Sequence, residues 1–154
     1  MISVRSTMPG RRWIITLLGA GVAITTLMLS APRVQAQGAQ GAMVTLDQAR
    51  ADAEAGRALL VDIREPDEHA TGVAPGARLL PMRQLSSRLA ELPKDRPVLL
   101  ICNTQNRSRA TYDALRQRGY TNLQYVEGGM SEWTKRRWPL VAPAKAAQQT
   151  PAAR

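Results

Sequence analysis

The amino-acid sequence predicts a single α/β domain with a mainly parallel sheet and helices on both faces. Two observations support this fold class. Short apolar runs of strand length alternate along the chain with segments of helical periodicity. The run Val98–Ile101 is apolar throughout, as expected for a strand that is buried on both faces. Alternating strands and helices form parallel sheets, in which sites lie beyond the carboxyl ends of the strands.

The first predicted elements lie between residues 43 and 62. A short strand at 43–45 leads into a helix that Thr45 caps and Gly56 ends. Ala58–Asp62 is apolar until its carboxyl end, which predicts a second strand.

The middle of the domain begins with a helical turn that Pro66 opens. A loop at 72–76 follows, and 78–80 is predicted to form a third strand. The next segment has leucines at helical spacing, which predicts one helix with an apolar face formed by Leu85, Leu89 and Leu92.

The second half of the domain is predicted to begin with a strand at Pro97–Ile101. A helix over Ser108–Arg118 follows, and Gly119 ends it. The residues expected to face inward from this helix are Ala110, Ala114 and Leu115.

The last predicted elements are a strand at Leu123–Val126, two glycines at 128–129 and a helix that contains Trp133. Alanine, proline, glutamine and threonine dominate from residue 142, which predicts a disordered tail over 142–154. The domain is therefore expected to cover 43–141, after a short linker at 37–42.

The first 36 residues are predicted to be an export signal. They contain four arginines and no acid, and residues 13–32 carry no charge. Val34 and Ala36 then supply the side chains that a signal peptidase reads, so cleavage is expected after Ala36. Arg11 and Arg12 leave both the general and the twin-arginine routes open. The expected location is the periplasm; alternatively, the uncharged stretch remains as an inner-membrane anchor that faces the periplasm.

The charge pattern argues against a nucleic-acid-binding protein. The net charge of +9 falls to about +5 without the signal, and the remaining arginines are scattered among acids. Aromatic residues are few and form no stacking platform. We expect no nucleic-acid partner, and membrane contact only if the signal is retained. One cysteine and one histidine cannot make a metal site, and no cofactor is implied.

Cys102 is the only cysteine and the main functional candidate. It follows an apolar strand, and the loop behind it leads into a helix. Backbone N–H groups and the positive end of the helix dipole therefore converge near the thiol, which favours the nucleophilic thiolate. A lone thiol in an exported protein is either buried and inert or kept for its reactivity. The nearby Arg107 and Arg109 favour a reactive thiol, suited to sulfur chemistry or to holding an anion.

Three stretches in order resemble the signatures of single-domain rhodaneses, a family of sulfurtransferases. The first runs from Leu60 to Glu68 and continues through Gly72 to Ala77. The second is the loop from Cys102 to Ser108. The third is the run at 125–129, with Trp133 and the segment 138–140 after it. The resemblance covers residues 44–141 and implies a rhodanese-like fold.

The resemblance also implies a ping-pong transfer of sulfane sulfur. Cys102 would take a sulfur atom from a small anionic donor such as thiosulfate and become a persulfide. Cyanide or a thiol, on a small molecule or on a protein, would then accept the sulfur. The loop would stabilise both sulfur anions, and the loop residues expected to bind substrate are Asn103, Thr104, Gln105, Asn106, Arg107 and Ser108.

The same resemblance suggests roles for the charged residues near the loop. Arg64 is a candidate for binding the donor sulfonate, because a planar guanidinium suits an oxyanion. The alternative is a network of Asp62 and Arg64 that ties loops together, and Asp62 is expected to be structural. Arg107 is expected to orient the loop or bind the donor, unless it forms a structural ion pair. His69 is expected to be an exposed histidine with no role as a general base.

Gln105 departs from the family pattern, since glycine is frequent at its position. If the position needs a positive φ, glutamine introduces strain or changes the shape of the loop. The neutral side chains of Thr104 and Gln105 would also help to select the substrate.

Two other functions remain open. A docking or persulfide-carrier module would share these residues, although rhodanese docking modules usually lack the cysteine. A phosphatase or arsenate reductase of the Cdc25 type carries its arginine six residues after the cysteine. Here Ser108 holds that place and Arg107 comes fifth. The shorter loop favours a single sulfur atom over a tetrahedral oxyanion.

Overall fold

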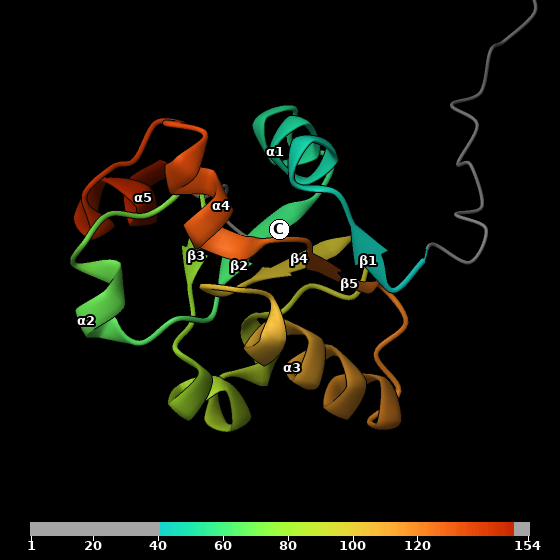
Figure 1. The fold of residues 1–154 in the computed structure, drawn as a ribbon. Coiled ribbons are helices and arrows are strands. Elements are labelled where there is room, and N and C mark those ends of the chain that lie inside the picture. Colours follow the sequence, from blue (N-terminus) through green and yellow to red (C-terminus); the bar gives the residue numbers. More distant parts are fainter. Residues whose placement is uncertain (1–40, 150–154) are drawn as a thin grey trace, which may run out of the picture. The chain divides into compact units, whose positions relative to one another are not determined.

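The computed structural model describes residues 41–149; the predicted signal and residues 37–40 of the predicted linker lie outside them. Five parallel strands form one sheet in the order β1-β5-β4-β2-β3 (Figure 1). The predicted α/β class and parallel sheet are therefore confirmed. The strands are β1 (Met43–Val44), β2 (Leu59–Asp62), β3 (Arg78–Leu79), β4 (Val98–Ile101) and β5 (Leu123–Val126).

The helices cover both faces of the sheet (Figure 1). α1 and α4 pack on one face, while α3 and the two 3-10 helices pack on the other. The helices are α1 (Leu46–Glu54), α2 (Pro66–His69), η1 (Met82–Ser87), η2 (Leu89–Glu91), α3 (Asn106–Gln117), α4 (Gly129–Lys135) and α5 (Pro143–Gln149).

Strand β4 lies in the middle of the sheet, and every residue of it is buried. Successive side chains of a strand point to opposite faces. Leu99 and Ile101 accordingly pack with α1 and α4, whereas Leu100 packs with α3. Cys102 continues this alternation and belongs to the core on the α3 side. The direction of its thiol is thus set by the strand before it.

The predicted helix around Leu85, Leu89 and Leu92 is wrong in form. The segment folds as two short 3-10 helices, η1 and η2, joined at Arg88. Arg88 has φ −116° and ψ 18°, which breaks the helix between them. Leucines at this spacing reach the core from 3-10 turns as well, because Leu85 and Leu92 are both buried.

Helix α3 begins at Asn106, two residues before the predicted start. Its buried residues are Ser108, Thr111 and Leu115, and the alanines expected to face inward, Ala110 and Ala114, are exposed. The buried face of α3 is therefore more polar than predicted. Ser108 on this face lies beside the thiol of Cys102.

The predicted disordered tail is wrong for residues 143–149, which form α5. Helix α5 contacts β3, and Ala146 on it is fully buried. Paired backbone hydrogen bonds between Val73 and Val141 fasten the chain just before this helix. No helix within residues 41–149 is long and apolar enough to cross a bilayer.

Candidate active site

Cys102 lies directly beyond the carboxyl end of β4, with its residue surface 1% exposed. Its Sγ accepts a hydrogen bond from the backbone N–H of Ser108 at 3.4 Å, across the loop that separates β4 from α3. The thiol also lies 3.6 Å from Ser108 Oγ, to which it donates. Ser108 Oγ in turn donates to the Gln105 carbonyl at 3.0 Å, so the loop closes around the sulfur.

The N–H groups of the loop are available for an anion. The N–H groups of residues 103–107 have no hydrogen-bond acceptor within the part of the chain that the structure describes. The side chains of Asn103, Thr104 and Asn106 are exposed. Unpaired amides that surround a sulfur atom stabilise negative charge on it or on a group bound to it. The prediction that these residues form an anion-binding loop is consistent with this geometry.

The N-terminus of α4 holds the carbonyl side of the loop. The N–H of Met130 donates to the Cys102 carbonyl at 2.8 Å, and the N–H of Ser131 donates to the Asn103 carbonyl at 2.9 Å. Because both carbonyls are turned toward α4, the loop presents its N–H groups on its other side. The contact is possible only because a glycine precedes these residues. A Cβ built on Gly129 would lie 2.4 Å from the Asn103 carbonyl oxygen.

Gln105 has a left-handed backbone, with φ 71° and ψ −18°. The position therefore does require a positive φ, in which a glutamine, unlike a glycine, is strained. Its side chain also forms a contact within the protein. Gln105 Oε1 accepts a hydrogen bond from the Gly128 N–H at 2.8 Å. The glutamine thus joins the active-site loop to the turn before α4, a contact that glycine could not make.

Arg107 forms the structural ion pair that was one of its predicted roles. Its two terminal nitrogens bind the two carboxylate oxygens of Glu68, at 2.7 and 2.5 Å. The bond from Arg107 holds the pKa of Glu68 below its usual value, against an opposing effect of burial. Glu68 also accepts from the Glu65 N–H and so caps α2. The pair fixes the loop to α2, and its side chains remain about one-third exposed.

The guanidinium of Arg64, a candidate for binding the donor sulfonate, is occupied by contacts within the protein. The residue is buried, and its guanidinium donates to both oxygens of the Asp62 carboxylate at distances of 2.7 to 3.0 Å. It also donates to the carbonyls of Glu68 and Gly72. These are the contacts that the alternative, a network of Asp62 and Arg64 that ties loops together, requires.

His69 is buried, and the expectation of an exposed histidine is wrong. Its Nε2 lies 3.5 Å from Asp62 Oδ1. Burial raises the pKa of Asp62, but the contacts with His69 and Arg64 outweigh it and hold that pKa below its usual value. His69 belongs to this buried cluster, so its expected lack of a general-base role is compatible with its position.

Glu68 is the residue at this site that sequence reasoning missed. Its spacing from Glu65, just before a helical turn, matches a capping box, and both bonds of that box are present. The spacing could have shown that Glu68 turns back toward its own helix. It could not have shown the partner 39 residues away, because only the folded chain brings Arg107 there.

Comparisons with known proteins agree on one family. Residues 45–136 match the model of the rhodanese-like domain. A protein of Allochromatium vinosum named sulfurtransferase is 41% identical over 99 residues, which are 64% of this chain and 91% of that protein.

Two solved structures show the same likeness. A rhodanese-related protein of Thermoplasma volcanium matches with a TM-score of 0.59 at 27% identity, over 65% of this chain and 97% of that one. A human single-domain sulfurtransferase matches with a TM-score of 0.58 at 25% identity, over 62% and 97% of the two chains. With its fold, its cysteine loop and these relatives, the chain belongs to the rhodanese-like family of sulfurtransferase-type proteins.

Proposed function

We propose that this protein transfers sulfane sulfur through a persulfide on Cys102. The observation that carries the proposal is the position of Sγ within a loop whose N–H groups at 103–107 have no acceptor among the described residues. Only the Ser108 N–H already binds the sulfur. Amides arranged in this way stabilise a thiolate before the reaction and a persulfide anion after it. The sulfurtransferase family supplies the reaction class, with sulfur donors and acceptors as its substrates in general.

Thiosulfate is the proposed donor, and cyanide or a thiol is the proposed acceptor. The Cys102 thiolate attacks the outer sulfur of thiosulfate, a sulfur–sulfur bond forms, and sulfite leaves with the electron pair of the broken bond. The acceptor then attacks the outer sulfur of the persulfide. Thiocyanate or a new persulfide leaves, and the Cys102 thiolate is restored. No external oxidant or reductant enters this cycle, in which the cysteine acts as a covalent nucleophile.

The Arg107–Glu68 pair is proposed to orient the loop while a donor binds. The pair holds the first turn of α3 against α2 through two bonds. The bond to Glu68 raises the pKa of the Arg107 guanidinium most, burial lowers it, and negative charge on Cys102 adds a smaller rise. The positive charge of Arg107 thus favours an anion at Cys102 even while Glu68 holds the side chain in place.

Initial rates with both substrates varied would test the proposal. A persulfide intermediate predicts parallel double-reciprocal plots, and Cys102→Ser should abolish thiocyanate formation. Arg107→Gln should lower kcat/KM for thiosulfate. Arg116→Gln is the matched control, because it removes an equal charge from an exposed residue near the far end of α3, and it should leave kcat/KM unchanged. Intersecting plots, or full activity in Cys102→Ser, would refute the persulfide route.

We further propose that the protein acts in the periplasm after cleavage at Ala36. The proposal rests on the basic, apolar and small-residue order of residues 1–36. Fractionation of bacterial cells that express the full chain, with N-terminal sequencing, should find a periplasmic protein that begins at Gln37. Replacing Arg11 and Arg12 by lysine should block export only on the twin-arginine route. An uncleaved membrane protein would support the anchored alternative, and full-length protein in the cytoplasm would contradict export.

A further inference from the structure

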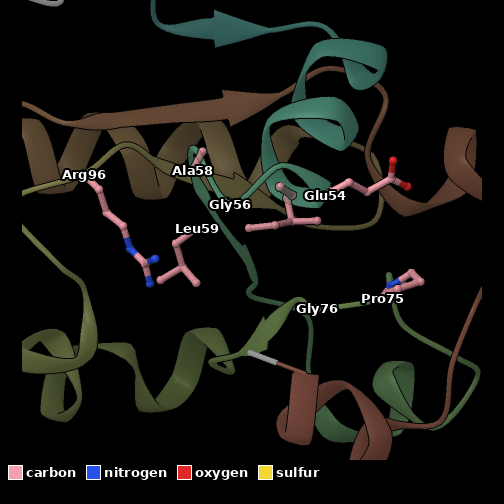
Figure 2. A pocket seen from close by; sticks show the side chains of 9 residues that line it. Glu54, Gly56, Ala58, Leu59, Pro75, Gly76 and Arg96 are labelled. Carbon is pink, nitrogen blue, oxygen red and sulfur yellow. The ribbon is translucent and has the colours of Figure 1, made fainter. Parts of the chain in front are cut away.

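A cavity of about 290 Å³ lies at the end of the sheet where β2 and β4 begin, opposite the end that carries the active site. It is bounded by the end of α1, the start of β2, the turn at Pro75 and Gly76, and the residue Arg96 before β4 (Figure 2). Cys102 follows the last residue of β4, whereas Arg96 precedes the first. At about 3.3 Å per residue, the two positions lie roughly 20 Å apart along the strand. The cavity is therefore separate from the sulfur-transfer site.

Arg96 brings an unpaired charge to this cavity. Its Nη2 is buried and has no hydrogen-bond partner within the described residues. The backbone there is fixed, because Asn122 Nδ2 donates to the carbonyls of Pro93 and Arg96 at 2.7 and 2.6 Å. The Leu59 N–H also donates to the next carbonyl, that of Pro97, at 2.9 Å. Arg96 as a whole is half-buried, but a guanidinium nitrogen that is buried without an acceptor is costly and is satisfied when an anion binds it.

The other charge at the cavity does not neutralise Arg96. Glu54 is already paired with Arg50, whose Nε lies 2.7 Å from Glu54 Oε1. In Figure 2 the Glu54 carboxylate lies on the far side of the cavity from the Arg96 guanidinium. The remaining side chains of the lining are apolar, from Ala53, Ala58, Leu59, Leu60 and Pro75. The cavity thus offers one cationic end and an apolar body.

We infer that this cavity binds a small aliphatic carboxylate, with the carboxylate on Arg96 and the hydrocarbon chain against Leu59 and Pro75. A carboxylate concentrates its charge at one end, where the planar guanidinium can bind it with two bonds. Phosphate and sulfate have further charged oxygens, which would face apolar side chains that cannot donate hydrogen bonds to them. The volume is near the lower end for ligand pockets, which limits the ligand to a short chain.

A nuclear magnetic resonance titration of the protein with butyrate would test the site. The backbone N–H signals of Gly56, Leu59 and Gly76 should shift and saturate, while butanol and chloride at equal concentration should not reproduce the shifts. Arg96→Gln should weaken binding about tenfold, the equivalent of about 1.4 kcal/mol. Arg116→Gln is the matched control, because it removes the same charge from an exposed position of α3 and should leave binding unchanged.

Three results would overturn the inference. Equal shifts with butanol would show an apolar cavity that does not use Arg96. Shifts confined to residues 103–108 would place the anion in the cysteine loop. Saturation by phosphate but not by butyrate would reject the ligand class. The comparison of butyrate with butanol needs only the unaltered protein, so the test stands even if Arg96→Gln does not fold.

Discussion

Gly129→Ala is expected to disrupt the active-site loop from outside it. Gly129 has φ 63°, and a Cβ on it would lie 2.4 Å from the Asn103 carbonyl oxygen and 2.5 Å from that of Cys102. These are backbone atoms, and neither can move freely. The N–H groups of Met130 and Ser131 bind the same two carbonyls at 2.8 and 2.9 Å. The methyl group can fit only if the loop moves away from the start of α4.

The cost of this substitution has three parts. A left-handed backbone costs a non-glycine residue about 1 kcal/mol. Forcing a methyl group into a filled space costs about 1–3 kcal/mol. The loss of the two hydrogen bonds from Met130 and Ser131 costs about 1 kcal/mol each. We therefore expect Gly129→Ala to lower the free energy of unfolding by about 4–6 kcal/mol and to abolish sulfur transfer.

Gly56→Ala separates backbone strain from steric overlap. Gly56 has a similar φ of 70°, but a Cβ on it would meet nothing within 4 Å. It should therefore lose only the backbone part, about 1 kcal/mol, and keep its activity. Urea unfolding, followed by tryptophan fluorescence with Trp133 buried in α4, measures both variants. Equal losses of stability in the two variants would refute the steric argument.

Three further predictions concern the polar contacts around the loop. Gln105→Ala should destabilise the protein by about 1 kcal/mol, because it keeps the positive φ but leaves the Gly128 N–H without its partner. In urea unfolding, Gln105→Gly should be more stable than Gln105→Ala, because glycine adopts the positive φ without strain. The reverse order would contradict strain at this position. A double-mutant cycle of Glu68→Gln and Arg107→Gln should give a coupling energy of about 0.5–1 kcal/mol, because the pair is bidentate but partly exposed. Additive losses would show that the pair is not formed in solution. The pKa values of Asp62 and Glu68 are lower in the folded protein, so their contribution to stability is present above their usual pKa values of about 4 and is lost as the pH falls through the folded values. The free energy of unfolding, measured against pH, should therefore fall at acid pH, and it should fall less steeply in Asp62→Asn. An equally steep fall in Asp62→Asn would contradict a lowered pKa for Asp62.

The sequence predicts best where local patterns and burial agree. The apolar runs before Asp62 and Cys102 form interior strands of the sheet. Such strands are buried on both faces, so their sequences are apolar throughout and can be recognised. Thr45 caps α1 through its own side chain, which makes the start of that helix readable from the residues alone. Gly119 ends α3 with a positive φ, as glycine after a helix does.

The errors arise where long-range contacts decide. α5 has a composition typical of disorder, but Ala146 is buried and the helix contacts β3. His69 is flanked by acids in the sequence, yet the short helix α2 turns it inward to Asp62. None of these contacts follows from local periodicity.

The central claim is that Cys102 carries the transferred sulfur. The intact mass of the protein, measured before and after one equivalent of thiosulfate, tests this claim most directly. We predict a gain of one sulfur atom that cyanide removes and that Cys102→Ser does not show. An unchanged mass with thiosulfate and with every other sulfane donor, in protein that is folded and reduced, would contradict it.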